Sequence, residues 1–196
     1  MTARVPRLAD IVALPRAEPD DVELVTRAKA GEVWAHEAIY RRYVQRVARV
    51  GQQLLRDPAD VDDIVQETFL IAFETIHRLS EAAALRGWLT GIAVHRVHRR
   101  FRWHRFTRLW TTAELARETR ASNDASPEVR AELVLIDQVL ARLPVAVRTA
   151  WVLRRVLGDS LEEIALACRC SLATVKRRIG EVEAELERHL SGSVAR

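Results

Sequence analysis

Apolar residues recur every three or four positions through most of the chain, which is the spacing of amphipathic helices. In the first half this pattern predicts four helices: one from Asp21 to a stop at Gly31, a second over about 34–55, a third that opens at Asp60, and an arginine-rich fourth that extends to about Arg105. Glycines and β-branched runs are few, which favours an all-helical protein. Four helices of this size suffice for a compact bundle.

The apolar pattern of the second half predicts another helical unit. Val129 begins an apolar series with steps of four, three, four and three residues, and a further helix follows within 144–158. Ser160 and Glu163 then have the spacing of a capping box, in which each side chain bonds a backbone N–H at the start of a helix. That helix is only about eight residues long, and Ser171 caps a longer one. A short helix, a tight turn and a long helix predict a helix-turn-helix.

Polar stretches flank and separate these two units. The first twenty residues contain three prolines and only short apolar patches, which predicts a tail without a packed fold. The stretch between the units ends in a Ser/Asn/Asp/Pro cluster and has no sustained apolar face. The prediction is an all-α fold of two small helical domains joined by a flexible linker. Its parts are an N-terminal tail (1–20), a bundle (21–106), a linker (107–127), a second domain (128–190) and a C-terminal tail (191–196).

Composition narrows the class of protein. The chain has 196 residues with 31 basic and 27 acidic side chains, a net charge of +4. No apolar run approaches the roughly 20 residues of a membrane span, and the only cysteines are Cys168 and Cys170. We therefore expect a cytoplasmic protein in which both cysteines are small core residues, with a thiol redox switch as the alternative. No nucleophile, base and orienting group fall into a catalytic pattern, so we predict that the chain is not an enzyme.

The most unusual stretch is residues 86–108, which contains seven arginines and three histidines. No acidic residue occurs between Glu81 and Glu114, so we expect this charge to face solvent or a polyanion rather than to be neutralised. Aromatic residues interrupt the arginines, and this combination suits phosphate binding together with base stacking. A solvated basic face is the alternative. His95 and His98 have a spacing that a metal pair could use, but no cysteine or carboxylate lies near them in sequence, and no metal or cofactor is predicted.

At this point both halves resemble one family, the bacterial RNA polymerase sigma factors of the small, extracytoplasmic-function type. Residues 60–73, DVDDIVQETFLIAF, and 85–100, LRGWLTGIAVHRVHRR, are similar to two helices of sigma region 2. Residues 140–179 follow the pattern of sigma region 4, with a Leu-Pro start, a glycine stop, a Glu-Glu-Ile-Ala helix and a Thr-Val-Lys recognition helix. A helix-turn-helix alone is weak support, whereas both modules in this order are much more specific.

The resemblance implies a role for each matching residue. The acidic helix would dock on the clamp helices of the polymerase β′ subunit through Asp60, Asp63, Gln66 and Glu67. The connection 80–86 and the arginine-rich helix would capture unpaired bases of the minus-10 promoter element, with contacts from Arg86, Trp88, His95, Arg96, Arg99, Arg100 and Trp103. The recognition helix would enter the major groove of the minus-35 element with Ala173, Thr174, Lys176, Arg177 and Arg178.

The resemblance also implies partners: RNA polymerase core, bound at its β′ clamp and β flap, promoter DNA, and an anti-sigma factor. Several positions depart from the family pattern, among them Gly180 and Glu181 of the recognition helix, where many relatives carry more polar or basic residues. His95 and Arg99 stand where Asn and Asp are common, and Arg169 replaces the glycine of the helix-turn-helix turn. We therefore expect Arg169 in a left-handed conformation at a cost of roughly 1 kcal/mol. The alternative from another class is a dimeric helix-turn-helix regulator that binds duplex DNA without polymerase.

Overall fold

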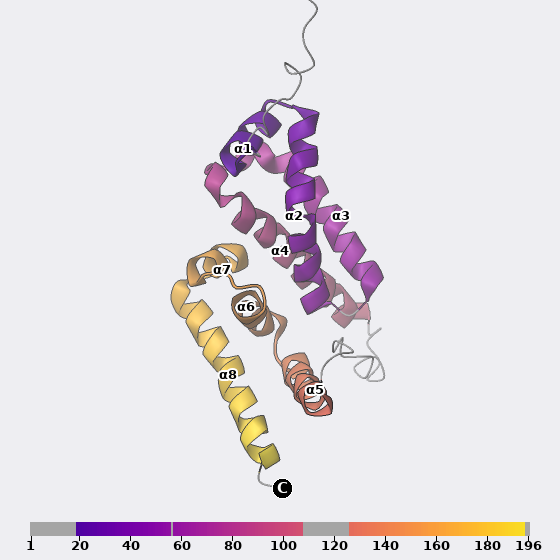
Figure 1. The fold of residues 1–196 in the computed structure, drawn as a ribbon, viewed down its shortest axis with the longest axis vertical. Helices are drawn as coiled ribbons and strands as arrows, with labels where there is room; N and C mark the ends of the chain where they lie inside the picture. Colours follow the sequence, from indigo (N-terminus) through magenta and orange to yellow (C-terminus); the bar gives the residue numbers. More distant parts are fainter. Residues whose placement is uncertain (1–18, 56, 108–125, 195–196) are drawn as a thin grey trace, which may run out of the picture.

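The computed structural model describes residues 19–55, 57–107 and 126–194. These residues form α-helices and short 3-10 turns without a strand, so the predicted all-α class is confirmed. The helices make two groups (Figure 1), which we call the N-terminal bundle and the C-terminal module. The predicted tail and linker lie mostly outside the described residues.

The N-terminal bundle consists of α1 (Asp21–Lys29), α2 (Val33–Leu54), α3 (Pro58–Thr75) and α4 (Leu85–Thr107), with η2 (Ile76–Arg78) and η3 (Ala82–Ala84) between the last two. Helix α3 begins two residues earlier than predicted. Asp57 caps it by accepting a 2.9 Å hydrogen bond from the backbone N–H of Ala59, and Pro58 occupies the first helical position, where its missing N–H costs nothing.

The C-terminal module consists of α5 (Pro127–Arg142), α6 (Val145–Arg155), α7 (Leu161–Cys168) and α8 (Leu172–Val194). The predicted capping box is present, since Glu163 N–H donates to Ser160 Oγ at 3.1 Å and Ser160 N–H donates to Glu163 Oε2 at 2.8 Å. Arg169 is left-handed as predicted, with φ 50° and ψ 51°. Helix α8 continues past residue 191, where the C-terminal tail was expected to begin.

The two groups share one apolar core. Its buried side chains include Ile39 and Leu89 from the bundle and Leu153, Ile164 and Val175 from the module. A smaller cluster joins α5, α6 and α8 around Val147 and Val182. Helix α7 lies directly on α4, and α6 contacts both α2 and α4 (Figure 1). The module is therefore packed against the helix that carries the arginines.

Both cysteines are partly buried against the shared core. Burial is the main reason why the pKa of the Cys168 thiol rises to about 12. A thiol with so high a pKa contains little of the thiolate that reacts with oxidants. This favours the packing role for Cys168 over the redox alternative.

Candidate nucleic-acid interface

Helix α4 presents four of the predicted minus-10 residues along one side. Trp88, His95, Arg99 and Trp103 follow one another at spacings of seven, four and four residues, which places them on a common helical face. Trp88 is half-buried, whereas the other three are exposed, Trp103 by 64%. This stripe offers an indole and a guanidinium group to solvent.

The other three predicted residues do not share that face, and two of them contact α3. Arg96 Nε lies 3.3 Å from Glu67 Oε2. Arg100 Nε donates to Asp60 Oδ1 at 2.7 Å, and its Nη2 donates to Asp63 Oδ2 at 3.0 Å. The hydrogen bond that Arg100 donates to Asp60 is the largest cause of a raised pKa for Arg100. Helix α3 thus neutralises much of the charge on this side of α4.

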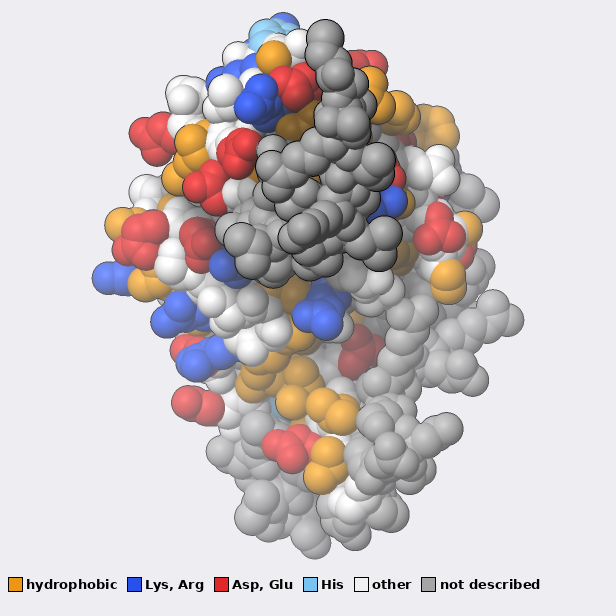
Figure 2. Space-filling view, turned by 45° about the horizontal axis from the view of Figure 1, so that its top comes forward, with side chains coloured by type: hydrophobic (Ala, Val, Ile, Leu, Met, Phe, Trp, Pro, Cys, Tyr) orange, Lys and Arg blue, Asp and Glu red, His pale blue; other side chains and the backbone are white. Residues whose placement is uncertain are grey.

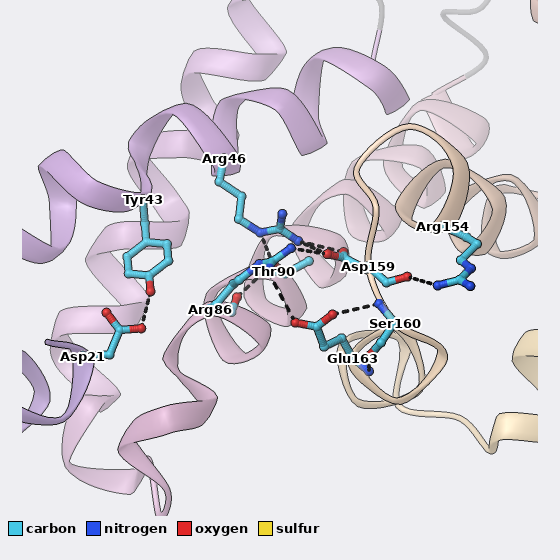
Figure 3. A network of polar contacts seen from close by, with 9 residues as sticks. All are labelled: Asp21, Tyr43, Arg46, Arg86, Thr90, Arg154, Asp159, Ser160 and Glu163. Atoms are coloured by element: carbon cyan, nitrogen blue, oxygen red, sulfur yellow. Dashed lines mark hydrogen bonds and ion pairs between the residues drawn. The ribbon is translucent and has the colours of Figure 1, made fainter.

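The remaining predicted residue, Arg86, contacts the C-terminal module. Its Nη2 donates to Asp159 Oδ1 at 2.9 Å, and Nη1 lies 3.7 Å from Glu163 Oε1. Arg46 of α2 donates from Nη2 to Asp159 Oδ2 at 2.7 Å and from Nε to Thr90 Oγ1 at 3.1 Å. Asp159 is only 1% exposed, and Figure 3 shows the side chains of Arg46 and Arg86 directed at it. One buried carboxylate therefore accepts hydrogen bonds from two arginines of the bundle.

The expectation that the arginine charge stays without neutralisation is wrong for four residues: Arg86, Arg96, Arg99 and Arg100. Their acidic partners are distant in sequence but adjacent in the fold, and a window of sequence cannot reveal such pairs. On the face drawn in Figure 2, acidic and basic side chains are accordingly interspersed. Sequence reasoning missed Arg46 and Asp159 altogether, and the position of Asp159 just after a glycine stop was the only signal available.

Two glycines of α4 face α7. A Cβ atom at Gly91 would lie 3.4 Å from Ala167 Cα and 3.5 Å from its carbonyl oxygen. One helical turn earlier, a Cβ atom at Gly87 would lie 3.6 Å from Leu166 Cδ2. A methyl group would thus make ordinary van der Waals contact at both positions, with the backbone of α7 at Gly91 and with the Leu166 side chain at Gly87.

His98 extends this contact toward α6. Its Nε2 lies 3.0 Å from Thr149 Oγ1, and the guanidinium of Arg148 stacks over the Phe101 ring at 4.8 Å. Burial, with smaller effects from nearby cations such as Arg102, lowers the pKa of His98 to about 4. His98 faces Thr149, whereas His95 is exposed, and no cluster of three potential metal ligands occurs among the described residues.

The burial of His98 predicts acid sensitivity. Because its pKa is about 4 in the folded protein and near 6.5 when exposed, the unfolded chain binds more protons between these values. The free energy of unfolding should therefore fall as pH decreases from about 6.5 to 4, and this contribution should be constant above that range. Urea unfolding across this range checks it: His98→Gln should flatten the slope, whereas replacing the exposed His77 by Gln should leave it unchanged. Equal slopes in all three proteins would refute the assignment.

The recognition helix α8 presents its predicted residues outward. Ala173, Lys176 and Arg177 are exposed, while Thr174 and Arg178 are half-buried over the core residue Val175. Ser171 caps the helix by accepting from the N–H of Thr174 at 3.2 Å. The exposed ammonium and guanidinium groups suit contacts with phosphates and base edges.

The four predicted docking residues of α3 divide into two kinds. Asp63 and Gln66 are exposed, and Glu67 is half-buried beside Arg96. Asp60 is buried in its contact with Arg100. Only Asp63 and Gln66 therefore have most of their surface available to a partner.

In the described part of the chain, no helix combines the length and apolarity needed to cross a bilayer.

Comparisons with known proteins agree with both modules. The family model of sigma-70 region 2 matches residues 39–107, and that of sigma-70 region 4 matches residues 133–186. The chain is 31% identical over 179 residues to the RNA polymerase sigma factor NccH of Alcaligenes xylosoxydans xylosoxydans, covering 88% of this chain and 96% of the relative. It is 33% identical over 167 residues to the ECF RNA polymerase sigma factor SigC of Mycobacterium tuberculosis, covering 83% of this chain and 89% of the relative.

A solved structure shares the fold. CnrH in complex with the cytosolic domain of CnrY superposes with a TM-score of 0.65 at 24% identity, covering 88% of this chain and 97% of that one. The two family models, in the order region 2 then region 4, and relatives of more than 30% identity over most of the chain agree with one another. The chain therefore belongs to the sigma-70 family of RNA polymerase sigma factors, of the extracytoplasmic-function type.

Proposed function

We propose that this sigma factor docks on the β′ clamp through α3, opens and holds the minus-10 element with α4, and reads the minus-35 element with α8. The observation that carries the proposal is a pair of exposed surfaces on two separate modules: the stripe of Trp88, His95, Arg99 and Trp103 on α4, and the outward side of α8. A single-module regulator needs only the second of these surfaces.

The stripe on α4 suits single-stranded DNA. An unpaired base can stack on the exposed indole of Trp103, and such stacking contributes about 1–3 kcal/mol per base. Arg99 lies one helical turn away, with its side chain 59% exposed, and can bind the adjacent phosphate. Binding energy of this size offsets the few kcal/mol that extrusion of a base from the duplex requires.

Helix α8 suits duplex DNA. Lys176 and Arg177 point away from the buried Val175 and Ile179, so the helix can enter a major groove with its apolar side still packed. Thr174 and Arg178 are half-buried beside them, and Ala173 adds only a methyl group. The side chains of Thr174, Lys176, Arg177 and Arg178 together offer hydrogen-bond donors on this side of α8. This surface is the proposed minus-35 reader.

The proposed partners follow from these surfaces and from the relatives. On α3, Asp63 and Gln66 are the residues most available to the β′ clamp, with Glu67 and Asp60 behind them, and we assign the β flap to the C-terminal module. CnrH is described in complex with the cytosolic domain of CnrY, and a sigma factor RpoE in complex with the anti-sigma factor NepR. We propose an anti-sigma factor for this chain as well, and a cytoplasmic location beside the polymerase, which performs the catalysis.

Run-off transcription tests the function. Core polymerase from the same organism, supplied with this chain and sheared genomic DNA, should yield discrete transcripts that core alone does not make. Transcript ends would then locate the minus-10 and minus-35 elements. If the chain bound duplex DNA but neither bound core nor produced transcripts, the dimeric regulator would be the correct function instead.

A further inference from the structure

We propose that Glu181 reads a cytosine of the minus-35 element in the major groove, and that it rejects guanine and thymine at that position. Glu181 is an acidic residue on the outward side of α8, one helical turn beyond the proposed contact Arg177. The inference rests on the proposed role of α8 as the minus-35 reader, and it names one base that this helix selects.

Glu181 lies where α8 is open to solvent. Its side chain is 41% exposed, whereas the neighbouring Ile179 and Val182 are buried, with 8% and 0% exposure. Gly180 is also exposed, and a Cβ atom there would meet no other part of the described chain within 4 Å. A glycine at such a position adds no bulk to the helix surface, so another molecule can approach the backbone closely. The carboxylate of Glu181 can therefore reach the base edges of a groove.

The carboxylate of Glu181 pairs with a residue that is itself proposed to bind DNA. Among the described residues its partner is Arg177, whose Nη1 lies 3.4 Å from Glu181 Oε2. Both side chains are exposed, so water screens the pair and the two charges can separate at little cost. Glu183, by contrast, is held at the side of the helix by Arg155 of α6. When Arg177 turns to contact DNA, Glu181 therefore faces the groove without its cation.

A carboxylate in the major groove needs a hydrogen-bond donor. Phosphates repel it, and so do the acceptors O6 and N7 of guanine and O4 of thymine. The groove offers two donors, the N4 amino group of cytosine and the N6 amino group of adenine. Adenine presents N6 beside the acceptor N7, whereas cytosine presents N4 without an acceptor on the same base edge. Cytosine is therefore the base that Glu181 accommodates best, and repulsion disfavours the others.

The spacing along α8 places this cytosine near the contact of Arg177. Residues four apart in an α-helix differ by about 6 Å along its axis, and successive base pairs are about 3.4 Å apart. With α8 in the groove, Glu181 thus lies about two base pairs from the contact of Arg177. A glutamate that only positioned Arg177 would affect the base at Arg177 and not a second base. The two roles therefore predict changes at different positions of the element.

The test uses polymerase assembled with the full chain and a promoter found by run-off transcription, with its minus-35 region randomised. Bound duplexes are sequenced, and Arg177→Ala locates the base at Arg177. The wild type should prefer cytosine at a second position by about tenfold, the lower part of the range for base contacts because Glu181 accepts from one amino group. In Glu181→Gln the preference there should change to adenine, since an amide donates to N7 and accepts from N6. In Glu181→Arg it should change to guanine.

Glu187→Gln is the matched control. It removes the same charge from an exposed residue in the C-terminal half of α8. Because the N-terminal residues of a recognition helix make the base contacts, this variant should keep the wild-type preferences.

Three results would overturn the assignment of Glu181 and leave α8 as the reader: an element without a preferred cytosine, preferences that are the same in Glu181→Gln and the wild type, or changes confined to the base at Arg177. If wild-type polymerase selected no minus-35 sequence at all, the proposed role of α8 would be wrong, and the inference would fall with it. Run-off transcription and core binding report separately on the sigma function.

Discussion

Replacing Lys176 and Arg177 together by alanine is expected to weaken promoter binding by the assembled polymerase about a hundredfold. Both side chains are exposed on the outward side of α8, and each contact of this kind contributes about 1–3 kcal/mol. The salt dependence of binding should also decrease by about two in its logarithmic slope, because two phosphate-neutralising charges are removed. Affinity for core polymerase alone should be unchanged.

A charge-matched control distinguishes groove contacts from general attraction. Arg155→Ala combined with Arg188→Ala removes the same total charge from the C-terminal module, at two exposed residues outside the first turns of α8. This control should bind the promoter within about threefold of the wild type, since charges outside the contact surface act only through a screened field. Equal losses in the two double variants would argue against α8 as the minus-35 reader.

Replacing Asp60 by asparagine is expected to lower the free energy of unfolding by about 2 kcal/mol. Asp60 is 7% exposed and accepts from Arg100, so the substitution leaves a partly buried guanidinium against a neutral amide instead of a carboxylate. The value lies below that for a fully buried pair because Arg100 keeps 31% side-chain exposure and a second partner, Asp63. For a chain of this length the melting temperature should fall by about 4–8 °C.

The neighbouring carboxylate provides the control. Asp63→Asn removes the same charge from a side chain that is 52% exposed, and should change stability by less than about 0.5 kcal/mol. It should instead weaken binding to core polymerase, which a pull-down at varied salt would measure. If Asp60→Asn weakened core binding with no loss of stability, Asp60 would be a docking residue and not a support for α4.

Features that depend on a few neighbouring residues could be predicted from the sequence. The Ser160–Glu163 capping box and the left-handed Arg169 follow from local backbone chemistry, and both occur as expected. The outward side of α8 also follows, because the buried positions Val175, Ile179 and Val182 recur at helical spacing. The exposure of Ala173, Lys176 and Arg177 could therefore be predicted from the sequence, while their contact with the minus-35 element stays a prediction.

Contacts between distant parts of the chain could not be predicted in the same way. Arg100 and Asp60 are 40 residues apart, and Arg46 and Asp159 are 113 apart. The spacing of apolar residues gives no sign of such pairs, because each charged side chain would fit the helical pattern equally well if it faced solvent. The positive charge of residues 86–108 is therefore continuous in the sequence. In the fold, Arg96 and Arg100 pair with α3, Arg86 pairs with the C-terminal module, and Arg99 lies in the exposed stripe.

The sharing of Asp159 by two arginines has a genetic consequence. Loss of Arg86 would remove a proposed promoter contact and one donor to Asp159 at once, so its effect on transcription would combine a binding defect with weaker packing of the two modules. Arg46 donates to Asp159 and to Thr90 and is not a proposed promoter contact, so its loss would act through the packing of the helices alone. Comparing transcription by Arg46→Gln and Arg86→Gln should thus separate the two effects, because only Arg86 is proposed to touch the promoter.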